Sequence, residues 1–318
     1  MTPAPDQQLS EGPADLWDLV IVGAGAAGLT CAIYAGRARL KTLVLERMMP
    51  GGQLVLNHII ENYPGFAEGV TGFQLAEQMH LQAARFGAKI ETAEVQALRL
   101  SDPFHVVTST GDHRARAVLI ATGCSPRKLG VPGEKELYGR GVSYCATCDG
   151  PLFTGKPLVV VGGGNTAIDE ALFLSRFASQ VTVVHRRDQL RADPILQERA
   201  FENPKIDFLW SHVVTEIVGD HSVQAIRARH VVSGAETQRP AAGVFIAVGE
   251  IPQTDFLPPE IARDGAGYII ADHHLQTSVP GIFVAGDVRA GAYRQIAAAV
   301  GEGALAYRSI REHLQRLS

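Results

Sequence analysis

The sequence predicts an α/β protein made of two similar units, with the second unit inserted into the first. Two observations carry this prediction. A short apolar strand, a glycine-rich turn and a helix follow one another twice along the chain, and two apolar strands that end at glycine bracket the second occurrence. A chain of 318 residues is also long enough for two hydrophobic cores.

The first occurrence begins with the apolar run 19–22, which predicts a buried strand. The turn Gly23-Ala24-Gly25-Ala26-Ala27-Gly28 follows, and residues 29–38 have the pattern of a helix. A second apolar run, 42–45, ends at Glu46, about 20 residues after the glycines. Glycines let a pyrophosphate approach the helix N-terminus, where unpaired amides favour an anion, and the carboxylate can accept hydrogen bonds from ribose hydroxyls. This pattern indicates a dinucleotide-binding unit.

The second occurrence has strands at 158–161 and 181–184, separated by Gly162-Gly163-Gly164-Asn165-Thr166-Ala167 and a helix. Where the first unit has its carboxylate, this unit has His185-Arg186-Arg187, with Arg191 shortly after. Guanidinium groups bind a 2′-phosphate through charge-assisted hydrogen bonds, whereas a carboxylate would repel it. We therefore expect NADPH rather than NADH here. The alternative is a solvated basic stretch at the start of a loop.

The order of strands predicts the domain layout. The apolar strands 117–123 and 243–249 bracket the second unit, as expected for two chain crossings, and a further strand at 281–287 ends in an acid. We expect two Rossmann-like, three-layer ββα/αβ dinucleotide-binding domains, the second inserted into the first. The predicted parts are a flexible tail at 1–15, a first domain at 16–119 and 247–318, and an inserted domain at 120–246.

Composition is typical of a soluble globular enzyme: 46% of the residues are hydrophobic, 19% are charged, and the formal net charge is −4. A net negative charge gives no indication of the basic surface that nucleic-acid-binding proteins use. No apolar run approaches the roughly 18 residues of a membrane-spanning helix, and the N-terminus does not resemble a signal peptide. Four cysteines are too few for a secreted disulfide framework. We therefore expect a cytoplasmic protein with neither nucleic-acid nor membrane partners.

The segment Cys145-Ala146-Thr147-Cys148-Asp149 places two thiols on one turn with a carboxylate beside the second. Such a pair can close as a readily reduced disulfide, or it can supply half of a metal site. Structural zinc needs about four ligands, and the chain offers neither a second cysteine pair nor a His-x₃₋₅-His set, so we expect no metal. Cys145 and Cys148 are then redox-active, and Asp149 either moves a proton or caps a helix.

Several longer motifs occur in a fixed order along the chain. They are GGQL at 51–54, ENYPGF at 61–66, ATG at 121–123, CATCDG at 145–150, GGGNTA at 162–167, HRRDQLRA at 185–192, AGD at 285–287 and YRQ at 293–295. From about Leu16 onward the chain resembles the low-molecular-weight, bacterial-type thioredoxin reductases, which are flavoproteins of the second class of pyridine nucleotide-disulfide oxidoreductases. The resemblance implies FAD in the first domain, NADPH in the inserted domain, a homodimer, and NADPH-dependent reduction of a thioredoxin or thioredoxin-like protein.

The resemblance also implies a set of binding residues. Around FAD it places Gly23, Gly25, Gly28, Glu46, Gln53, Asn62, Asp287, Arg294, Gln295 and Ile296. Around NADPH it places Gly162, Gly164, Asn165, Thr166, His185, Arg186, Arg187 and Arg191. The residues Arg294 to Ile296 would stand at a helix start near the pyrimidine edge of the flavin, where helix amides favour the negative charge of the reduced ring. The alternative is that Arg294 is an ordinary arginine at a helix start, without a role in flavin binding.

In the implied mechanism, hydride passes from NADPH to FAD, and the reduced flavin reduces the Cys145–Cys148 disulfide. Cys148 faces the flavin, Cys145 attacks the partner's disulfide, and Asp149 exchanges the proton that a leaving thiolate needs. Dithiol and nicotinamide cannot occupy the same space at the flavin, so the resemblance implies a rotation of the inserted domain. Gly123 and Gly249 are the expected hinges.

The chain departs from many relatives at Pro151-Leu152, where two aromatic residues usually follow the motif, and at Asn57, where threonine is common. The sequence therefore predicts the redox reaction more firmly than the identity of the protein partner. Arg140 matches a position implicated in docking the partner, or it is an ordinary surface arginine. Two alternatives to the whole assignment stay open: a divergent flavin disulfide reductase with another thioredoxin-like partner or electron donor, and a non-catalytic, flavin-bound redox sensor.

Overall fold

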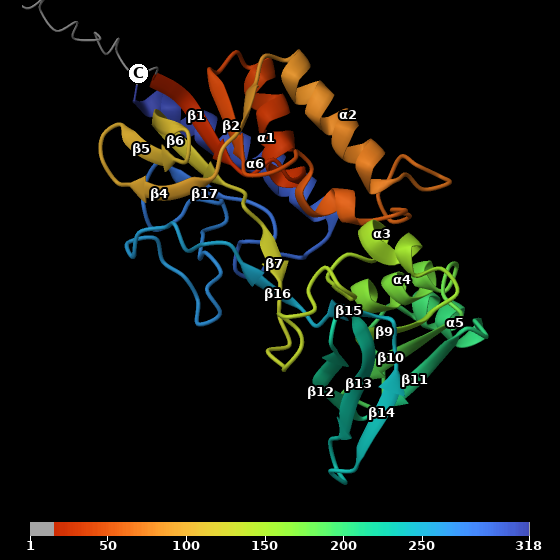
Figure 1. Ribbon diagram of the computed structural model, residues 1–318. Helices are drawn as coiled ribbons and strands as arrows, with labels where there is room; N and C mark the ends of the chain where they lie inside the picture. The colour runs from red at the N-terminus through yellow and green to blue at the C-terminus, as the bar shows by residue number, and fades with distance from the viewer. Residues whose placement is uncertain (1–15, 318) are drawn as a thin grey trace, which may run out of the picture. The chain divides into compact units, whose positions relative to one another are not determined.

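The computed structural model describes residues 16–317 (Figure 1), so the predicted flexible tail at 1–15 lies outside the described residues. The chain divides into two compact units. Among the described residues, unit 1 contains 16–55, Ile59–Cys124 and 252–317, whereas unit 2 contains Leu56–His58 and Ser125–Ile251. Both units are α/β structures with parallel strands at their centre, which confirms the predicted fold class. Which nucleotide each unit binds stays a prediction.

Unit 1 is built on a seven-stranded sheet in the order β3-β2-β1-β6-β5-β4, with β17 paired to β6. Strands β3, β2, β1, β6 and β17 are parallel neighbours, whereas β4, β5 and β6 are antiparallel. Parallel neighbours need long crossovers, which α1 and α2 supply. The strands are β1 (Leu16–Val22), β2 (Thr42–Glu46), β3 (Lys89–Thr92), β4 (Val95–Arg99), β5 (Phe104–Thr108), β6 (Gly111–Ile120) and β17 (Ile282–Val284). The helices are α1 (Ala26–Arg37), η1 (Gly52–Leu56), α2 (Gly72–Arg85) and α6 (Ile296–Arg316).

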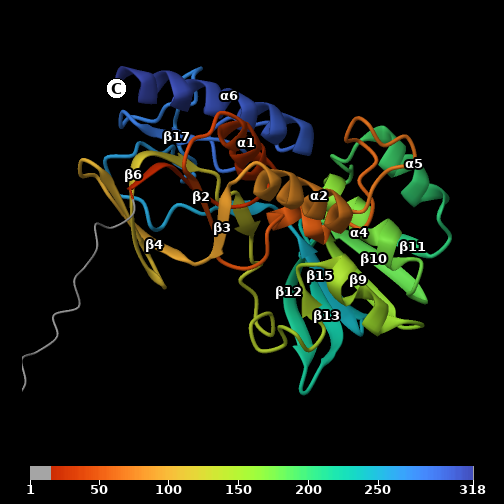
Figure 2. The ribbon, with the colours of Figure 1, turned by 90° about the horizontal axis from the view of Figure 1, so that it is seen from above.

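Alternate residues of β1 point to opposite faces of this sheet. Leu19 and Ile21 belong to a buried cluster with residues of α1, α2 and α6, and α1 and α6 lie side by side in Figure 2. Val20 and Val22 belong to a second cluster, which includes residues of β4 and β5 and Leu257. The period-two pattern of an apolar strand therefore builds a core on each face of the sheet.

Unit 2 repeats this arrangement with a five-stranded parallel sheet in the order β11-β10-β9-β15-β8. Val160 and Val183 pack with α4 and α5 on one face, whereas Val159 and Val184 pack with an antiparallel sheet, β12-β13-β14, on the other. The strands are β8 (Val142–Ser143), β9 (Pro157–Gly162), β10 (Gln180–His185), β11 (Ile206–Trp210), β12 (His212–Gly219), β13 (Val223–His230), β14 (Glu236–Pro240) and β15 (Gly243–Ala247). The helices are α3 (Ala146–Asp149), η2 (Gly150–Phe153), α4 (Asn165–Leu174) and α5 (Pro194–Glu202).

Two short strands carry the chain between the units. They are β7 (Cys124–Pro126) and β16 (Glu250–Pro252), and they pair with each other. Gly123 and Gly249 directly precede the two strands, with φ of +62° and +113°. A Cβ added at either glycine would meet nothing within 4 Å. The backbone conformation, rather than crowding, therefore requires glycine at both connections.

Candidate functional site

Cys145 and Cys148 form a disulfide at the start of α3. Cys145 is the N-cap residue, and its Sγ accepts the backbone N–H of Cys148 at 3.2 Å and lies 3.3 Å from Thr147 Oγ1. The N–H of Cys145 donates to Ser143 Oγ at 3.0 Å. Cys145 is half-buried and Cys148 is exposed. The Thr147 hydroxyl donates its proton to the carbonyl oxygen of Leu56. Once the disulfide opens, the N–H of Cys148 therefore stabilises a thiolate on Cys145.

The residues that follow the pair differ in exposure. Asp149 ends α3, and among the described residues its side chain makes no capping hydrogen bond at the start of η2. Its role in proton transfer stays a prediction. Leu152 is 73% exposed, whereas Phe153 packs edge-on against Phe245 with ring centroids 5.9 Å apart. The departure at 151–152 therefore presents an aliphatic side chain at the surface where many relatives have an aromatic one.

The first glycine turn connects β1 to α1. Gly23 has φ of +105°, and a Cβ there would lie 2.4 Å from the carbonyl oxygen of Ala121. A Cβ at Gly28 would lie 2.0 Å from the carbonyl oxygen of Gly23, so only glycine allows the helix to pack this closely on the turn. At Gly25, the N-cap of α1, a Cβ would meet nothing within 4 Å and no side chain caps the helix. Open space in front of uncapped amides fits a pyrophosphate.

Two acidic residues lie beside this turn. Glu46, at the end of β2, accepts the N–H of Ala24 at 2.9 Å. Asp287 follows Gly286, where a Cβ would lie 3.1 Å from the Cβ of Ala27 in the first turn of α1. The structure therefore places both predicted acids next to the start of α1, although they come from opposite ends of the sequence.

Hydrogen bonds join the other predicted residues of unit 1. Asn62 Nδ2 donates to Gln295 Oε1 at 3.0 Å. Gln53 Nε2 donates to the carbonyl oxygen of Cys124 at 2.9 Å, and Cys124 Sγ donates to the carbonyl oxygen of Asp287 at 3.4 Å. Cys124 therefore links the predicted residues 53 and 287, and a separate hydrogen bond links the predicted residues 62 and 295.

Arg294 and Gln295 precede α6, and Ile296 begins it. No side chain caps this helix start. The Arg294 guanidinium lies over the Tyr268 ring, 4.6 Å from its centroid, in a cation–π contact. The uncapped amides suit an anionic edge of a ligand, and the stacked arginine lies beside them.

The second glycine turn connects β9 to α4. A Cβ at Gly162 would lie 2.4 Å from the carbonyl oxygen of Ala247, and one at Gly163 would lie 2.4 Å from the His185 ring. Gly164 is the N-cap of α4, with no side-chain cap and open space at its Cβ position. This turn therefore offers a second cradle for a pyrophosphate.

Hydrogen bonds hold the segment 191–193, which begins with Arg191, beside this glycine turn. Asn165 Nδ2 donates to Asp193 Oδ2 at 2.8 Å, and the N–H of Asp193 donates to Asn165 Oδ1 at 2.7 Å. Thr166, beside Asn165, is exposed. The N–H of Arg191 donates to the carbonyl oxygen of Gly163 at 2.7 Å. Residues 191–193 are thus held beside the glycine turn by three hydrogen bonds.

The basic residues after β10 differ in exposure; they are His185, Arg186, Arg187 and Arg191. Arg186, Arg187 and Arg191 are exposed, and none of them forms an ion pair with another described residue. His185 is 5% exposed, and its ring lies against Gly163 with Nε2 unpartnered among residues 16–317. Burial, together with the positive charges of the three arginines, lowers the pKa of His185. The arginines are therefore available to an anion, whereas the imidazole supports the turn from within.

Comparison with known proteins agrees with this geometry. Residues 17–303 match the family model of the pyridine nucleotide-disulphide oxidoreductases. The chain is 46% identical to the thioredoxin reductases of Listeria innocua and Treponema pallidum, over 95% of this chain and 95% and 98% of theirs. The solved structure of the thioredoxin reductase of Lactococcus lactis matches with a TM-score of 0.92 and 42% identity, over 94% of this chain and 99% of that one.

The chain belongs to the thioredoxin reductase family. As a thioredoxin reductase it is an oxidoreductase whose cofactors are FAD and NADPH. The two uncapped glycine turns, one in each unit, fit two dinucleotides, and the disulfide in unit 2 fits a redox centre. The family and both cofactors predicted from the motifs are thereby confirmed.

Three side chains that hold the redox pair of this thioredoxin reductase were not predicted. Ser143 and Thr147 lie next to or inside the cysteine motif, and their hydroxyl groups were the signal that could have indicated them. Glu170, on α4, accepts the N–H of Ala146 at 3.4 Å. No pattern in the sequence connects Glu170 with the cysteine motif.

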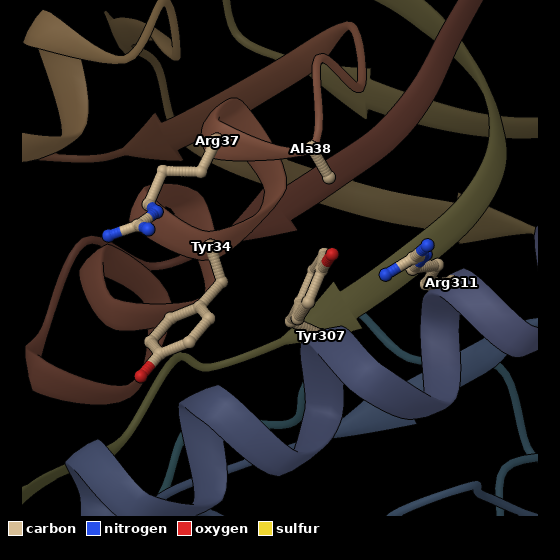
Figure 3. Close-up of a pocket in the computed structure, with 5 residues that line it drawn as sticks. All are labelled: Tyr34, Arg37, Ala38, Tyr307 and Arg311. Atoms are coloured by element: carbon tan, nitrogen blue, oxygen red, sulfur yellow. The ribbon is translucent and has the colours of Figure 1, made fainter.

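A pocket between α1 and α6 lies outside the candidate site. Its volume is about 460 Å³, and Tyr34, Arg37, Ala38, Tyr307 and Arg311 line it (Figure 3). Tyr34 is nine residues beyond the N-cap of α1, or roughly 14 Å along the helix, so the pocket is at the opposite end of α1 from the glycine turn.

Within residues 16–317, no helix is long and apolar enough to cross a membrane. In the same part of the chain, no group of three or more His, Cys, Asp or Glu side chains is placed to hold a metal ion.

Proposed function

We propose that this protein is an NADPH-dependent thioredoxin-disulfide reductase that passes electrons from NADPH through FAD to the Cys145–Cys148 disulfide and on to a thioredoxin or thioredoxin-like protein. One observation carries the proposal. A disulfide at a helix start lies in the same α/β unit as an uncapped glycine turn and three exposed arginines that form no ion pair within residues 16–317. Family membership supports the same activity.

Unit 1 would hold FAD. Its proposed contacts are Gly23, Gly25, Gly28, Glu46, Gln53, Asn62, Asp287, Arg294, Gln295 and Ile296. When bound, FAD supplies the chemistry that converts a hydride from NADPH into an electron pair for a disulfide. The uncapped start of α6 would stabilise negative charge on the ligand.

Unit 2 would hold NADPH. Its proposed contacts are Gly162, Gly164, Asn165, Thr166, Arg186, Arg187 and Arg191. The uncapped N-terminus of α4 would bind the pyrophosphate, and the three guanidinium groups would bind the 2′-phosphate. His185 is buried, so we assign it to supporting the turn rather than to contacting the phosphate.

The dithiol would then reduce the partner. An electron pair opens the Cys145–Cys148 bond and leaves one thiolate and, with a proton, one thiol. The Cys145 thiolate, which accepts the N–H of Cys148, forms a bond to one sulfur of the partner's disulfide. That disulfide breaks, and its leaving thiolate takes a proton from Asp149. Asp149, now a carboxylate, takes the proton of the Cys148 thiol, and the Cys148 thiolate attacks Cys145 Sγ. The bond between Cys145 and the partner's sulfur breaks, the internal disulfide re-forms, and the partner leaves with one thiol and one thiolate.

Between these steps unit 2 would rotate relative to unit 1 about the connections at Gly123 and Gly249. Both glycines have a positive φ and open space at the Cβ position, so neighbouring side chains do not oppose a change of backbone angles. Exposed Arg140 and Leu152 are the proposed contacts of the protein partner.

The assembly and the compartment belong to the same proposal. We assign a homodimer and a cytoplasmic location. The location is supported by the buried thiols of Cys31 and Cys124, neither of which is disulfide-bonded to another residue of 16–317, as a reducing compartment favours.

The test is NADPH oxidation by the purified holoenzyme, followed by absorbance with and without a thioredoxin and excess insulin disulfide. The proposed function predicts turnover that depends on thioredoxin. NADPH oxidation that is no faster with thioredoxin would instead support a flavin-bound sensor.

A further inference from the structure

Glu170 touches the redox helix, although the mechanism above does not use it. Its Oε1 accepts the backbone N–H of Ala146 at 3.4 Å. Ala146 is the first residue of α3, lies between the two cysteines and is 1% exposed. The other oxygen, Oε2, is closed off from solvent and has no hydrogen-bond partner among the described residues. A carboxyl group with one solvent-inaccessible, unpartnered oxygen is therefore hydrogen-bonded to the residue that follows Cys145.

We propose that Glu170 is a positioning residue for the Cys145–Cys148 pair, which holds the first turn of α3 through Ala146 and couples reduction of the disulfide to uptake of a proton. The inference deepens the proposed function and rests on it only in taking Cys145–Cys148 as the redox pair. Glu170 acts through the backbone and is not placed in contact with substrate or cofactor.

The surroundings of Glu170 favour its neutral form. Burial raises the pKa of Glu170 to about 8; the hydrogen bond from Ala146 opposes this shift, and the negative charge of Asp169 adds to it. The elements packed against α4 are α3, η2, β9, β10, β15 and α5. Their titratable or charged residues are Cys148 and Asp149 on α3, with Cys145 at its N-cap, His185 on β10, and Glu198, Arg199 and Glu202 on α5; β9, β15 and η2 have none.

The coupling follows from like charges. Opening the disulfide consumes two electrons and one proton and leaves a thiolate on Cys145 and a thiol on Cys148. An ionised Glu170 beside the first turn of α3 would repel that thiolate, whereas a neutral Glu170 would not. Below about pH 8 the carboxyl is neutral and reduction is unopposed. Above this pH the carboxyl is ionised in the oxidised protein, so reduction is either disfavoured or accompanied by uptake of one more proton by Glu170.

The experiment measures the disulfide equilibrium in the holoenzyme. Wild type, Glu170→Gln and the control Glu198→Gln are equilibrated with mixtures of reduced and oxidised dithiothreitol from about pH 6.5 to about pH 9. The samples are quenched in acid, and mass spectrometry gives the alkylated fraction of Cys145 and Cys148. Glutamine keeps an acceptor for the N–H of Ala146 but cannot ionise. Glu198 is an exposed glutamate on α5, so its change is chemically matched.

All three proteins should agree at about pH 6.5. At about pH 9 Glu170→Gln should be reduced at least about threefold more readily than wild type, which corresponds to a coupling of half a pKa unit, and Glu198→Gln should follow wild type. Glu170→Asp, which keeps a titrating carboxyl, should restore the pH dependence. A Glu170→Gln curve that coincides with wild type over the whole range overturns the coupling.

Hydrogen exchange tests separately whether Glu170 holds the first turn of α3. It also provides a test if one of the other variants folds poorly. Glu170→Leu removes the acceptor, so hydrogen exchange in the peptide that contains Ala146 should be roughly threefold faster than in Glu170→Gln. Equal exchange in the two variants overturns the holding role. Neither measurement needs NADPH or thioredoxin, so a failure of the proposed thioredoxin reduction would be seen separately.

Discussion

The backbone N–H of Arg191 donates a hydrogen bond to the carbonyl oxygen of Gly163, with 2.7 Å between the two atoms. Because this bond joins the basic segment to the glycine turn itself, the arginine side chain starts from a fixed point beside the proposed pyrophosphate cradle. The paired bonds between Asn165 and Asp193 hold the same segment from the other side. The backbone of Arg191 is thus held beside the glycine turn by hydrogen bonds on residues 191 and 193.

Selectivity for NADPH should depend on the exposed arginines. In a variant with Arg186→Gln and Arg187→Gln, the KM for NADPH should rise about tenfold or more, because charge-assisted hydrogen bonds to the 2′-phosphate are lost. The KM for NADH, which lacks this phosphate, should hardly change. Arg239→Gln, an exposed change on β14, is the control and should leave both values unaltered. Equal rises for the two nucleotides in the double variant would contradict the assignment.

Glu134 should stabilise the segment before the redox pair in a pH-dependent way. It is 4% exposed and accepts the N–H groups of Leu129 at 2.8 Å and Gly130 at 2.6 Å and the Tyr144 hydroxyl at 2.7 Å. Burial raises the pKa of Glu134, but these hydrogen bonds outweigh it and hold the pKa below its usual value of 4.5. A lowered carboxyl pKa gives stability above the usual value that is lost as the pH falls through the folded-state pKa.

The variant Glu134→Gln should therefore lower the free energy of unfolding by about 2 kcal/mol near neutral pH. The deficit should shrink as the pH falls below 4.5, because the wild-type carboxylate is then protonated as well. Urea unfolding at several pH values measures this, with the exposed Glu136→Gln as a matched control. A deficit that is the same at all pH values would show that charge is not involved.

Glu302 should secure the loop that carries Asp287. Its Oε2 accepts the N–H of Gly286 at 2.7 Å, and its Oε1 forms an ion pair with Arg289. Glu302→Leu leaves the largely buried arginine unpaired, so unit 1 should lose about 3 kcal/mol of stability and release FAD at a lower temperature.

Release is followed by the rise in flavin fluorescence on heating. Glu312→Leu, on the same helix, removes an exposed pair with Arg308 and should cost no more than about 0.5 kcal/mol. FAD release at the same temperature in both variants would argue against the loop assignment.

The two connections between the units should control turnover. Proline cannot adopt a positive φ, so alanine is the suitable probe; it disfavours this region by about 1 kcal/mol and narrows the range of backbone angles. A variant with Gly123→Ala and Gly249→Ala should lower kcat for thioredoxin reduction by about fivefold while FAD stays bound. Gly155→Ala has the same positive φ and open Cβ position but lies in a loop of unit 2. A fall in kcat of the same size in Gly155→Ala would contradict the hypothesis that Gly123 and Gly249 are hinges.

The sequence predicted what local patterns determine. Strand, glycine turn and helix are contiguous, so both turns and the fold class could be inferred. Helix α1 begins at Ala26 rather than at 29, because the extended backbone of the turn ends at Gly25. The Cys145–Cys148 pair lies within one turn, and its disulfide is confirmed. The roles of the binding residues stay predictions.

Contacts between distant segments could not be inferred in this way. The bond between Asn62 and Gln295 joins residues that are 233 positions apart, and it depends on the folding of all of unit 1. Glu170 reaches Ala146 only because α3 packs on α4. The buried position of His185 likewise depends on the close approach of Gly163, whereas its sequence neighbours are exposed arginines.

The central claim is that electrons reach the partner through the Cys145–Cys148 pair. Its most direct test is the rate of NADPH-driven thioredoxin reduction by Cys145→Ser holoenzyme, beside Cys31→Ala, which removes a buried thiol in α1. The account predicts that Cys145→Ser still binds FAD and bleaches with NADPH but reduces thioredoxin no faster than a blank without enzyme, while Cys31→Ala keeps its activity. Thioredoxin reduction by Cys145→Ser at the wild-type rate would contradict it.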